Sequence, residues 1–176
     1  MNIETVHKMI EEALLVKARQ NFERHGALLP VFFIIGDDDS INIIGTDMGD
    51  KDGIAKLVRD KCAELSATAI ILIHEAWMLV SKANLDEGLA KRGIYKVDGV
   101  TYMGGLEHVP GRIEVIHVTL ESKEMSGMSI WIAEIKRDGD KVTLLPFEKK
   151  EDGRKSTMKH EGRLVRFLPQ HDLGKV

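Results

Sequence analysis

The feature that most constrains the fold is a long apolar run over residues 67–81, which carries His74 and Glu75 at its centre. Burying an unpaired carboxylate costs several kcal/mol, so Glu75 has to be paired, protonated or exposed to water. The run is rich in isoleucine and apolar at odd and even positions alike, which is typical of an interior strand. We therefore expect the central strand of the core at this place.

The patterns on either side of this run predict two amphipathic helices and several short strands separated by turn-forming residues. The expected elements are a helix over 2–25, strands over 29–36 and 41–45, a helix over 51–65 capped by Asp50 or Asp52, the strand over 67–81, and strands over 112–122, 127–137 and 141–149. This order, α-β-β-α-β-excursion-β-β-β, predicts an α+β fold with a mostly antiparallel sheet of five to six strands and two main helices packed on one face. It resembles the order of profilin-like and roadblock-like folds, a likeness that implies no function.

We expect a single α+β domain over residues 1–148, interrupted by an excursion over 82–111. The excursion holds six of the sixteen glycines and both tyrosines. A segment this long in a small domain is often a functional lid or an interaction surface. A short hairpin is expected inside it over residues 95–102, with its turn at Asp98-Gly99.

The C-terminal extension over residues 149–176 is polar and basic, with a candidate edge strand over 163–169. Between residues 149 and 166 seven basic residues stand against three acidic ones, although the whole chain has a formal net charge of −3. Such a strip could follow a phosphate backbone, but no aromatic residue is interleaved before Phe167 to stack on bases. Nucleic-acid binding is therefore unexpected. A solvated arm, or a contact with the acidic body of a second subunit, is the simpler interpretation.

Motifs and composition exclude several classes of protein. The sequence has no Walker A motif, no GxGxxG after a strand, no GxSxG and no CxxC, and in HEAWM the second histidine of a zincin is replaced by Met78. No cofactor is therefore expected. The single cysteine, Cys62, lies on the apolar stripe of its helix, which predicts a buried thiol in a reducing compartment. With no signal-peptide pattern and no span of about 20 apolar residues, we expect a cytoplasmic protein without membrane contact.

Three ionisable residues in the middle of expected strands are the strongest candidates for chemistry, namely Glu75, His117 and Glu134. Strand parity places Glu75 and His74 on opposite faces. If neighbouring strands present matching faces, with His117 opposite Glu75, the three candidates form a carboxylate–imidazole cluster beneath a lid over 82–111. Such a cluster could do acid–base work or hold a metal. A structural polar network, or side chains that face water, is the alternative interpretation.

The sequence favours a protein that acts by association, as a homo-oligomer or with a protein partner, and without catalysis. The expected binding residues are Trp77, Tyr95, Tyr102 and Trp131, because large aromatic side chains are enriched at interfaces. The alternative is a small hydrolase or metal-assisted enzyme that uses the three ionisable candidates. The sequence thus leaves open whether the protein is an enzyme, and it assigns no metal ligand.

Overall fold

The N-terminal helix expected over residues 2–25 forms in three consecutive parts in the computed structural model, which describes residues 1–47, 49–79, 93–97, 100–104, 106–155 and 166–168. These parts are α1 (Ile3–Met9), the π-helical segment η1 (Ile10–Leu14) and α2 (Leu15–His25). Asn2 caps the first turn by accepting a hydrogen bond from the Thr5 amide at 2.9 Å. Gly26 ends α2 in the left-handed conformation, with φ +71°. The wider turn of the π segment rotates the buried stripe, so Leu15 is buried while Ala13 is exposed.

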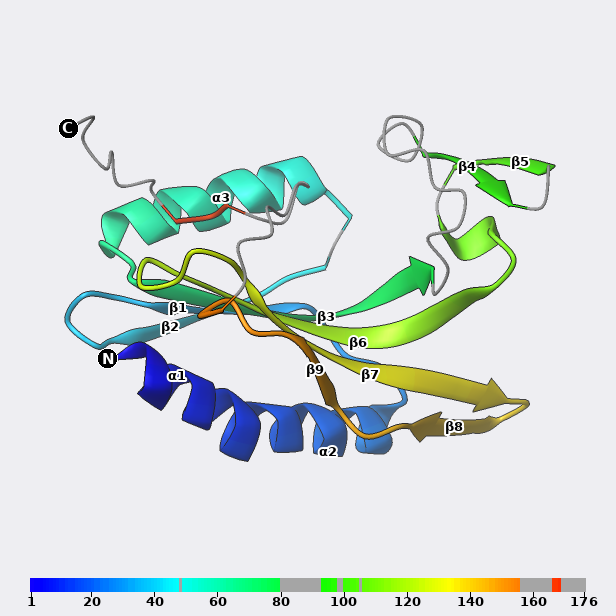
Figure 1. Ribbon diagram of the computed structural model, residues 1–176, viewed down its shortest axis with the longest axis horizontal. Helices are drawn as coiled ribbons and strands as arrows, with labels where there is room; N and C mark the ends of the chain where they lie inside the picture. The colour runs from blue at the N-terminus through cyan, green and yellow to red at the C-terminus, as the bar shows by residue number, and fades with distance from the viewer. Residues whose placement is uncertain (48, 80–92, 98–99, 105, 156–165, 169–176) are drawn as a thin grey trace.

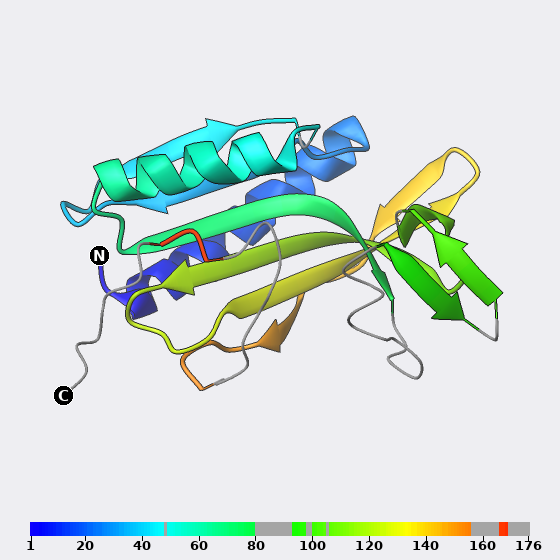
Figure 2. The same cartoon turned by 90° about the horizontal axis from the view of Figure 1, so that it is seen from above.

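Seven strands form the main sheet, and all its pairings among the described residues are antiparallel. Six of them follow in the order β2-β1-β3-β6-β7-β8, and β9 also pairs with β7. The sheet is strongly curved (Figures 1 and 2). Pro146, which has no amide hydrogen, lies between β8 and β9, so the strand expected over 141–149 is two strands. The bounds are β1 (Val31–Ile35), β2 (Ile41–Gly45), β3 (Ala69–Leu79), β6 (Arg112–Ser122), β7 (Ser129–Asp138), β8 (Lys141–Leu144) and β9 (Glu148–Glu151).

The helices lie on opposite faces of the sheet, so the expectation that both pack on one face is wrong (Figure 1). Ile71 and Ile73 of β3 belong to the core under α1 and α2, whereas Ile70 and Leu72 pack with α3 (Lys51–Glu64). The physical reason is present in the sequence of β3, because a strand that is apolar at odd and even positions needs a covering layer on each face. Asp50 is the N-cap of α3.

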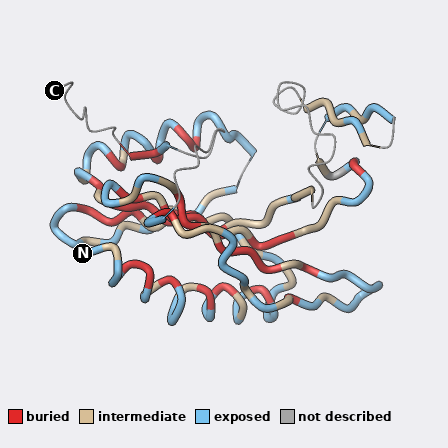
Figure 3. Tube along the Cα trace, in the orientation of Figure 1, coloured by how far each residue is buried: buried red, intermediate tan, exposed pale blue. Residues whose placement is uncertain are grey.

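Two apolar cores result, one on each side of the central strands (Figure 3). The larger core contains the buried side chains of α1 and α2 together with β3, β6 and β7. The smaller core contains the stripe of α3, including Cys62, whose side chain is 0% exposed as the sequence predicted. β3 contributes to both cores and is therefore the structural centre of the molecule.

Part of the excursion forms a second, two-stranded sheet. β4 (Ile94–Val97) pairs with β5 (Val100–Met103), and Tyr95 lies opposite Tyr102, which confirms the expected hairpin. Its turn at Asp98-Gly99 lies outside the described residues, as do residues 80–92. A short 3-10 turn, η2 (Leu106–His108), leads into β6. In the described part of the chain, no helix is long and apolar enough to cross a membrane.

The described parts of the C-terminal region contact the rest of the molecule. The boundary suggested at residue 148 falls at β9, which pairs with β7 in the main sheet. The candidate edge strand over 163–169 lies largely outside the described residues, but Phe167 and Leu168 are buried against the core of α3. The Glu121 carboxylate accepts hydrogen bonds from both of their amides, at 3.1 and 2.9 Å.

Candidate functional site

Glu75 and His117 do not meet, because the register of β3 and β6 places them on opposite faces of the sheet. Glu75 lies opposite Ile116, and it is His74 that lies opposite His117. The Glu75 carboxylate accepts a hydrogen bond from the amide of Leu28, at the entrance to β1. Burial raises the pKa of Glu75, and the Glu114 carboxylate raises it further, whereas the Leu28 hydrogen bond lowers it. The expected convergence of Glu75, His117 and Glu134 is therefore wrong.

His117 and Glu134 do share a face, and the second histidine on that face is His74. The two imidazole rings meet edge to face with centroids 5.4 Å apart, and His117 Nδ1 lies 3.4 Å from His74 Nε2. His74 Nδ1 also lies 3.0 Å from the backbone oxygen of Glu75, and burial lowers the pKa of His74. Glu134 forms an ion pair with Lys136. No group of three potential metal ligands is clustered among the residues that the structure describes.

The four aromatic residues expected to bind a partner lie in different environments. Trp131 is 2% exposed and sits in the larger core with its ring 5.3 Å from that of His7, so it offers no surface to a partner. Trp77 is 38% exposed, and the Arg112 guanidinium lies 4.8 Å from its ring centroid. Tyr95 and Tyr102 are half-buried partners in the β4–β5 hairpin. The four side chains therefore do not form one common surface.

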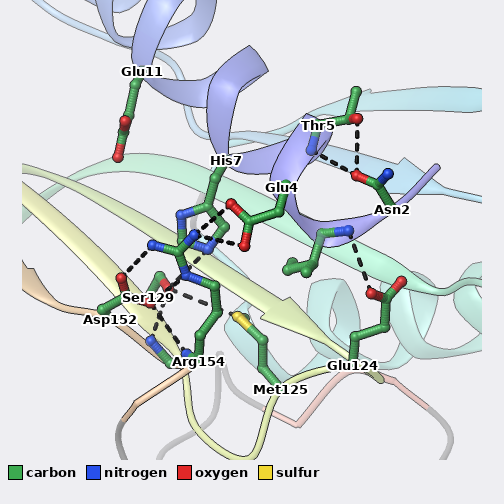
Figure 4. Close-up of polar contacts among 12 residues, drawn as sticks. Asn2, Glu4, Thr5, His7, Glu11, Glu124, Met125, Ser129, Asp152 and Arg154 are labelled. Atoms are coloured by element: carbon green, nitrogen blue, oxygen red, sulfur yellow. Dashed lines mark hydrogen bonds and ion pairs between the residues drawn. The ribbon is translucent and has the colours of Figure 1, made fainter.

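A buried polar network joins the N-terminal helix to β7 and β9, and it was not predicted from the sequence (Figure 4). Ser129 Oγ lies 3.2 Å from His7 Nε2, and the amide of Gly153 donates to the same oxygen at 2.9 Å. His7 Nδ1 lies 3.1 Å from Lys149 Nζ. Ser129 is 0% and His7 3% exposed. The sequence contains one signal for the burial of His7. This residue lies four positions after Ile3 and three before Ile10, so in a helix it shares their apolar stripe.

This serine–histidine contact has the wrong hydrogen-bond direction for a nucleophile and its base. The Lys149 ammonium is only a donor, so His7 Nδ1 accepts and the ring hydrogen of neutral His7 lies on Nε2. Nε2 therefore donates to Ser129 and has no lone pair with which to take its proton. Burial lowers the pKa of His7, and the charges of Lys149 and Arg154 lower it further, so the ring is held neutral. The network is structural.

Basic residues at the start of the C-terminal extension pair with acidic groups of the same chain. Lys149 Nζ lies 2.9 Å from Glu11, and Arg154 lies 2.7 Å from Glu4. Arg154 also pairs with Asp152, and its hydrogen bonds hold the pKa of that carboxyl well below its usual range. This part of the positive strip therefore binds the N-terminal helix, which leaves less charge for a phosphate backbone.

The two outer edges of the main sheet differ in charge. β2, at one end of the strand order, has the sequence INIIG, with no charged residue and no proline. At the other end, β9 has the sequence EKKE and pairs with β7 through an irregular register, while β8 begins with Lys141. Ile41 and Ile43 of β2 are 41% and 63% exposed. A charge-free edge strand with exposed isoleucines is available for pairing.

Comparison of the chain with models of protein families, with curated proteins and with solved structures finds no match. The described residues offer two features with functional potential, namely the free edge of β2 and a cavity beside α2.

Proposed function

We propose that this protein acts by association and that its primary interface is the edge of β2, where a second copy pairs to form a homodimer. The observation that carries the proposal is the contrast between the two sheet edges. Natural sheets protect their edges with charges, prolines or bulges, because unpaired backbone groups otherwise recruit another strand. β9 carries charged residues and pairs through an irregular register, and β2 has neither of these features.

The backbone of β2 supports a symmetric pairing in one particular register. Hydrogen bonds from Gly36 N to Ser40 O, at 2.9 Å, and from Thr46 N to Pro30 O, at 3.1 Å, fix which residues of the strand bond to β1. Since bonded and non-bonded pairs alternate in an antiparallel ladder, the amides and carbonyls of residues 41, 43 and 45 point away from β1. These three positions are symmetric about Ile43. A two-fold axis at Ile43 therefore lets the same three residues of both copies bond to each other.

The side chains fit the same register. Ile43 would meet Ile43 of the partner subunit, and Ile41 would lie opposite the partner's Gly45. A Cβ built on Gly45 meets nothing within 4 Å, so this position has room for the facing isoleucine. The pairing would cover Ile41 and Ile43, two of the exposed large apolar side chains of the described surface. Strand addition of this kind combines backbone hydrogen bonds with apolar burial.

Sedimentation velocity at micromolar concentration tests the proposal directly. The expected mass is twice the 19.7 kDa of one chain. Ile43→Lys places a charge at the centre of the proposed pairing and is expected to give a monomer. Thr143→Lys, on the exposed edge at β8, adds the same charge and is expected to leave the dimer intact. A monomeric wild-type protein, or a dimer that survives Ile43→Lys, would count against the β2 interface.

Cysteine cross-linking tests the register. Directly opposed residues of a bonded antiparallel pair have Cα atoms about 5.5 Å apart, within the range of about 4.4–6.8 Å that a disulfide spans. Ile43→Cys is therefore expected to form a covalent dimer under mild oxidation, and Thr143→Cys is not. The native Cys62 does not interfere, because burial raises the pKa of its thiol to about 12.

The enzyme suggested as an alternative depended on Glu75, His117 and Glu134 meeting in one cleft, and the sheet separates Glu75 from the other two. Association is therefore the function that the geometry supports best. A cytoplasmic location remains part of this proposal, since Cys62 is a free, buried thiol suited to a reducing compartment.

A further inference from the structure

A cavity of about 690 Å³ opens between α2 and the sheet. Its apolar lining includes Phe33 of β1, Ile73 of β3 and the connection over residues 27–30, and α2 forms the opposite wall. The volume lies within the range of about 300–1,000 Å³ that is typical of small-ligand pockets. Most lining side chains are aliphatic or aromatic, so the cavity suits an apolar chain or ring.

The polar side chains of the cavity all come from α2. Lys17, Asn21 and His25 follow one another at intervals of four residues, which places them in one row on the surface of the helix. Each can donate a hydrogen bond, and lysine can only donate. No aspartate or glutamate is among the described residues that line the cavity. The complementary ligand is therefore an apolar chain that ends in an acceptor or a negative charge.

Lys17 is the favourable position for that charge. The C-terminal end of a helix carries a negative partial charge, which disfavours anions near His25 and Gly26, but the effect is confined to the last turn. Lys17 precedes His25 by eight residues, about 12 Å along the helix axis. Glu75 is not among the lining residues, and its carboxylate is occupied by the Leu28 amide.

We propose that this cavity binds a single-chain anionic amphiphile, such as a fatty carboxylate. The carboxylate would accept hydrogen bonds from Lys17 and Asn21, and the alkyl chain would lie against Phe33, Ile73 and Leu28. The site is formed within one chain, and its only lining residue in β2 is Gly45, which in the proposed dimer would lie opposite the partner's Ile41. Its ligand class follows from an apolar lining, a row of donors on one wall and a lining without acidic side chains.

Isothermal titration calorimetry with dodecanoate tests the class of ligand. One site per chain is expected for the wild-type protein, and dodecyltrimethylammonium, which has the same chain and the opposite charge, is expected to bind at least tenfold more weakly. Lys17→Gln is expected to weaken dodecanoate about tenfold. Lys8→Gln removes an exposed lysine that does not line the cavity and is expected to change nothing. Equal affinity for the two amphiphiles would overturn the assignment.

Two variants of α2 test the location of the site. Asn21→Phe places a ring in the cavity and is expected to abolish binding, whereas Gln20→Phe puts the same ring on an exposed position outside it. Ile43→Lys removes the proposed dimer, alters no residue that lines the cavity and adds a positive charge beside it, so it is expected to bind dodecanoate at least as tightly as the wild-type protein. Failure of one proposal is therefore distinguishable from failure of the other. Undiminished binding by Asn21→Phe would overturn the proposal. The absence of dodecanoate binding to the wild-type protein would also overturn the proposal. This holds even if the protein binds phosphatidylglycerol vesicles.

Discussion

Replacing Ser129 by alanine is the sharpest test of the buried network, because one oxygen serves two donors there. Ser129 Oγ accepts the Gly153 amide at 2.9 Å and lies 3.2 Å from His7 Nε2, and the serine is 0% exposed. Water cannot replace the lost acceptor easily at such depth. Each buried donor left unsatisfied costs about 1–3 kcal/mol, so Ser129→Ala, which orphans two donors, should lower the free energy of unfolding by about 2–6 kcal/mol.

Urea unfolding followed by circular dichroism and tryptophan fluorescence measures this loss, and Trp131 reports on it locally because its ring lies 5.3 Å from that of His7. Ser122→Ala is the matched control. Ser122 Oγ accepts one amide, that of Glu124 at 3.2 Å, and Glu124 is exposed, so water can take over. The control should cost less than about 1 kcal/mol. If both variants lose the same free energy, the network does not stabilise the fold in the way the geometry indicates.

A double-mutant cycle separates the two donors. His7→Phe removes the ring donor, so Ser129→Ala in that background orphans only the Gly153 amide. Ser129→Ala should therefore lower the free energy of unfolding by about 1–3 kcal/mol less in the His7→Phe background than in the wild-type protein. Strict additivity would mean that His7 and Ser129 do not interact, which would contradict the hydrogen-bond direction assigned to Lys149, His7 and Ser129.

Three further outcomes follow from the packing and the charges. Gly153→Ala would place a Cβ 2.6 Å from the carbonyl oxygen of Gly127, so thermal unfolding should show a loss of about 1–3 kcal/mol. Cys62 should not react with a thiol reagent at pH 8 until the protein is unfolded in urea, because burial raises its pKa to about 12. Burial lowers the pKa of His7 and His74, so below pH 6.5 the unfolded chain takes up protons that the folded one does not. Stability measured by urea unfolding should therefore fall as the pH drops from 7.5 to 5, and a His7→Phe variant should show a shallower fall.

The positions of the helices and of most strands could be predicted from the sequence, but the pairing and register of the strands could not. Periodicity identified the helices and most strands, because burial of a stripe or a face leaves a direct mark on the sequence. The partner of Glu75 depended on the register of β3 against β6, and a shift by one residue exchanges the faces. His117 lies opposite His74 instead. The apolar residues on both faces of β3 are the signal in the sequence that indicates a helical layer on each side of the sheet.

The candidate sites were also predictable only in part, because their local elements are visible in the sequence and their tertiary surroundings are not. The INIIG sequence of β2 was recognised as a strand, but its place at the end of the sheet depends on the order of all the strands. The row Lys17, Asn21 and His25 has a helical spacing that the sequence displays. The cavity beside it is also lined by Phe33 of β1 and Ile73 of β3, whose positions next to α2 depend on the tertiary fold. The π segment, which no propensity pattern predicted, rotates α2 relative to α1 and so helps to decide which side chains face the sheet.

The position of β3 in both cores has a consequence for how the chain folds. Its neighbours come from distant parts of the sequence: Ile73 pairs with Val31, and His74 with His117. Contacts between residues so far apart in the chain form only after long loops have closed. Loop closure costs conformational entropy before the contacts contribute stability, so folding should be slow for a domain of this size. Neither helical layer can pack on the sheet before β3 has paired with its neighbours, so both layers should unfold in a single cooperative transition. Amide hydrogens of residues 70–73 should then exchange at the rate of global unfolding.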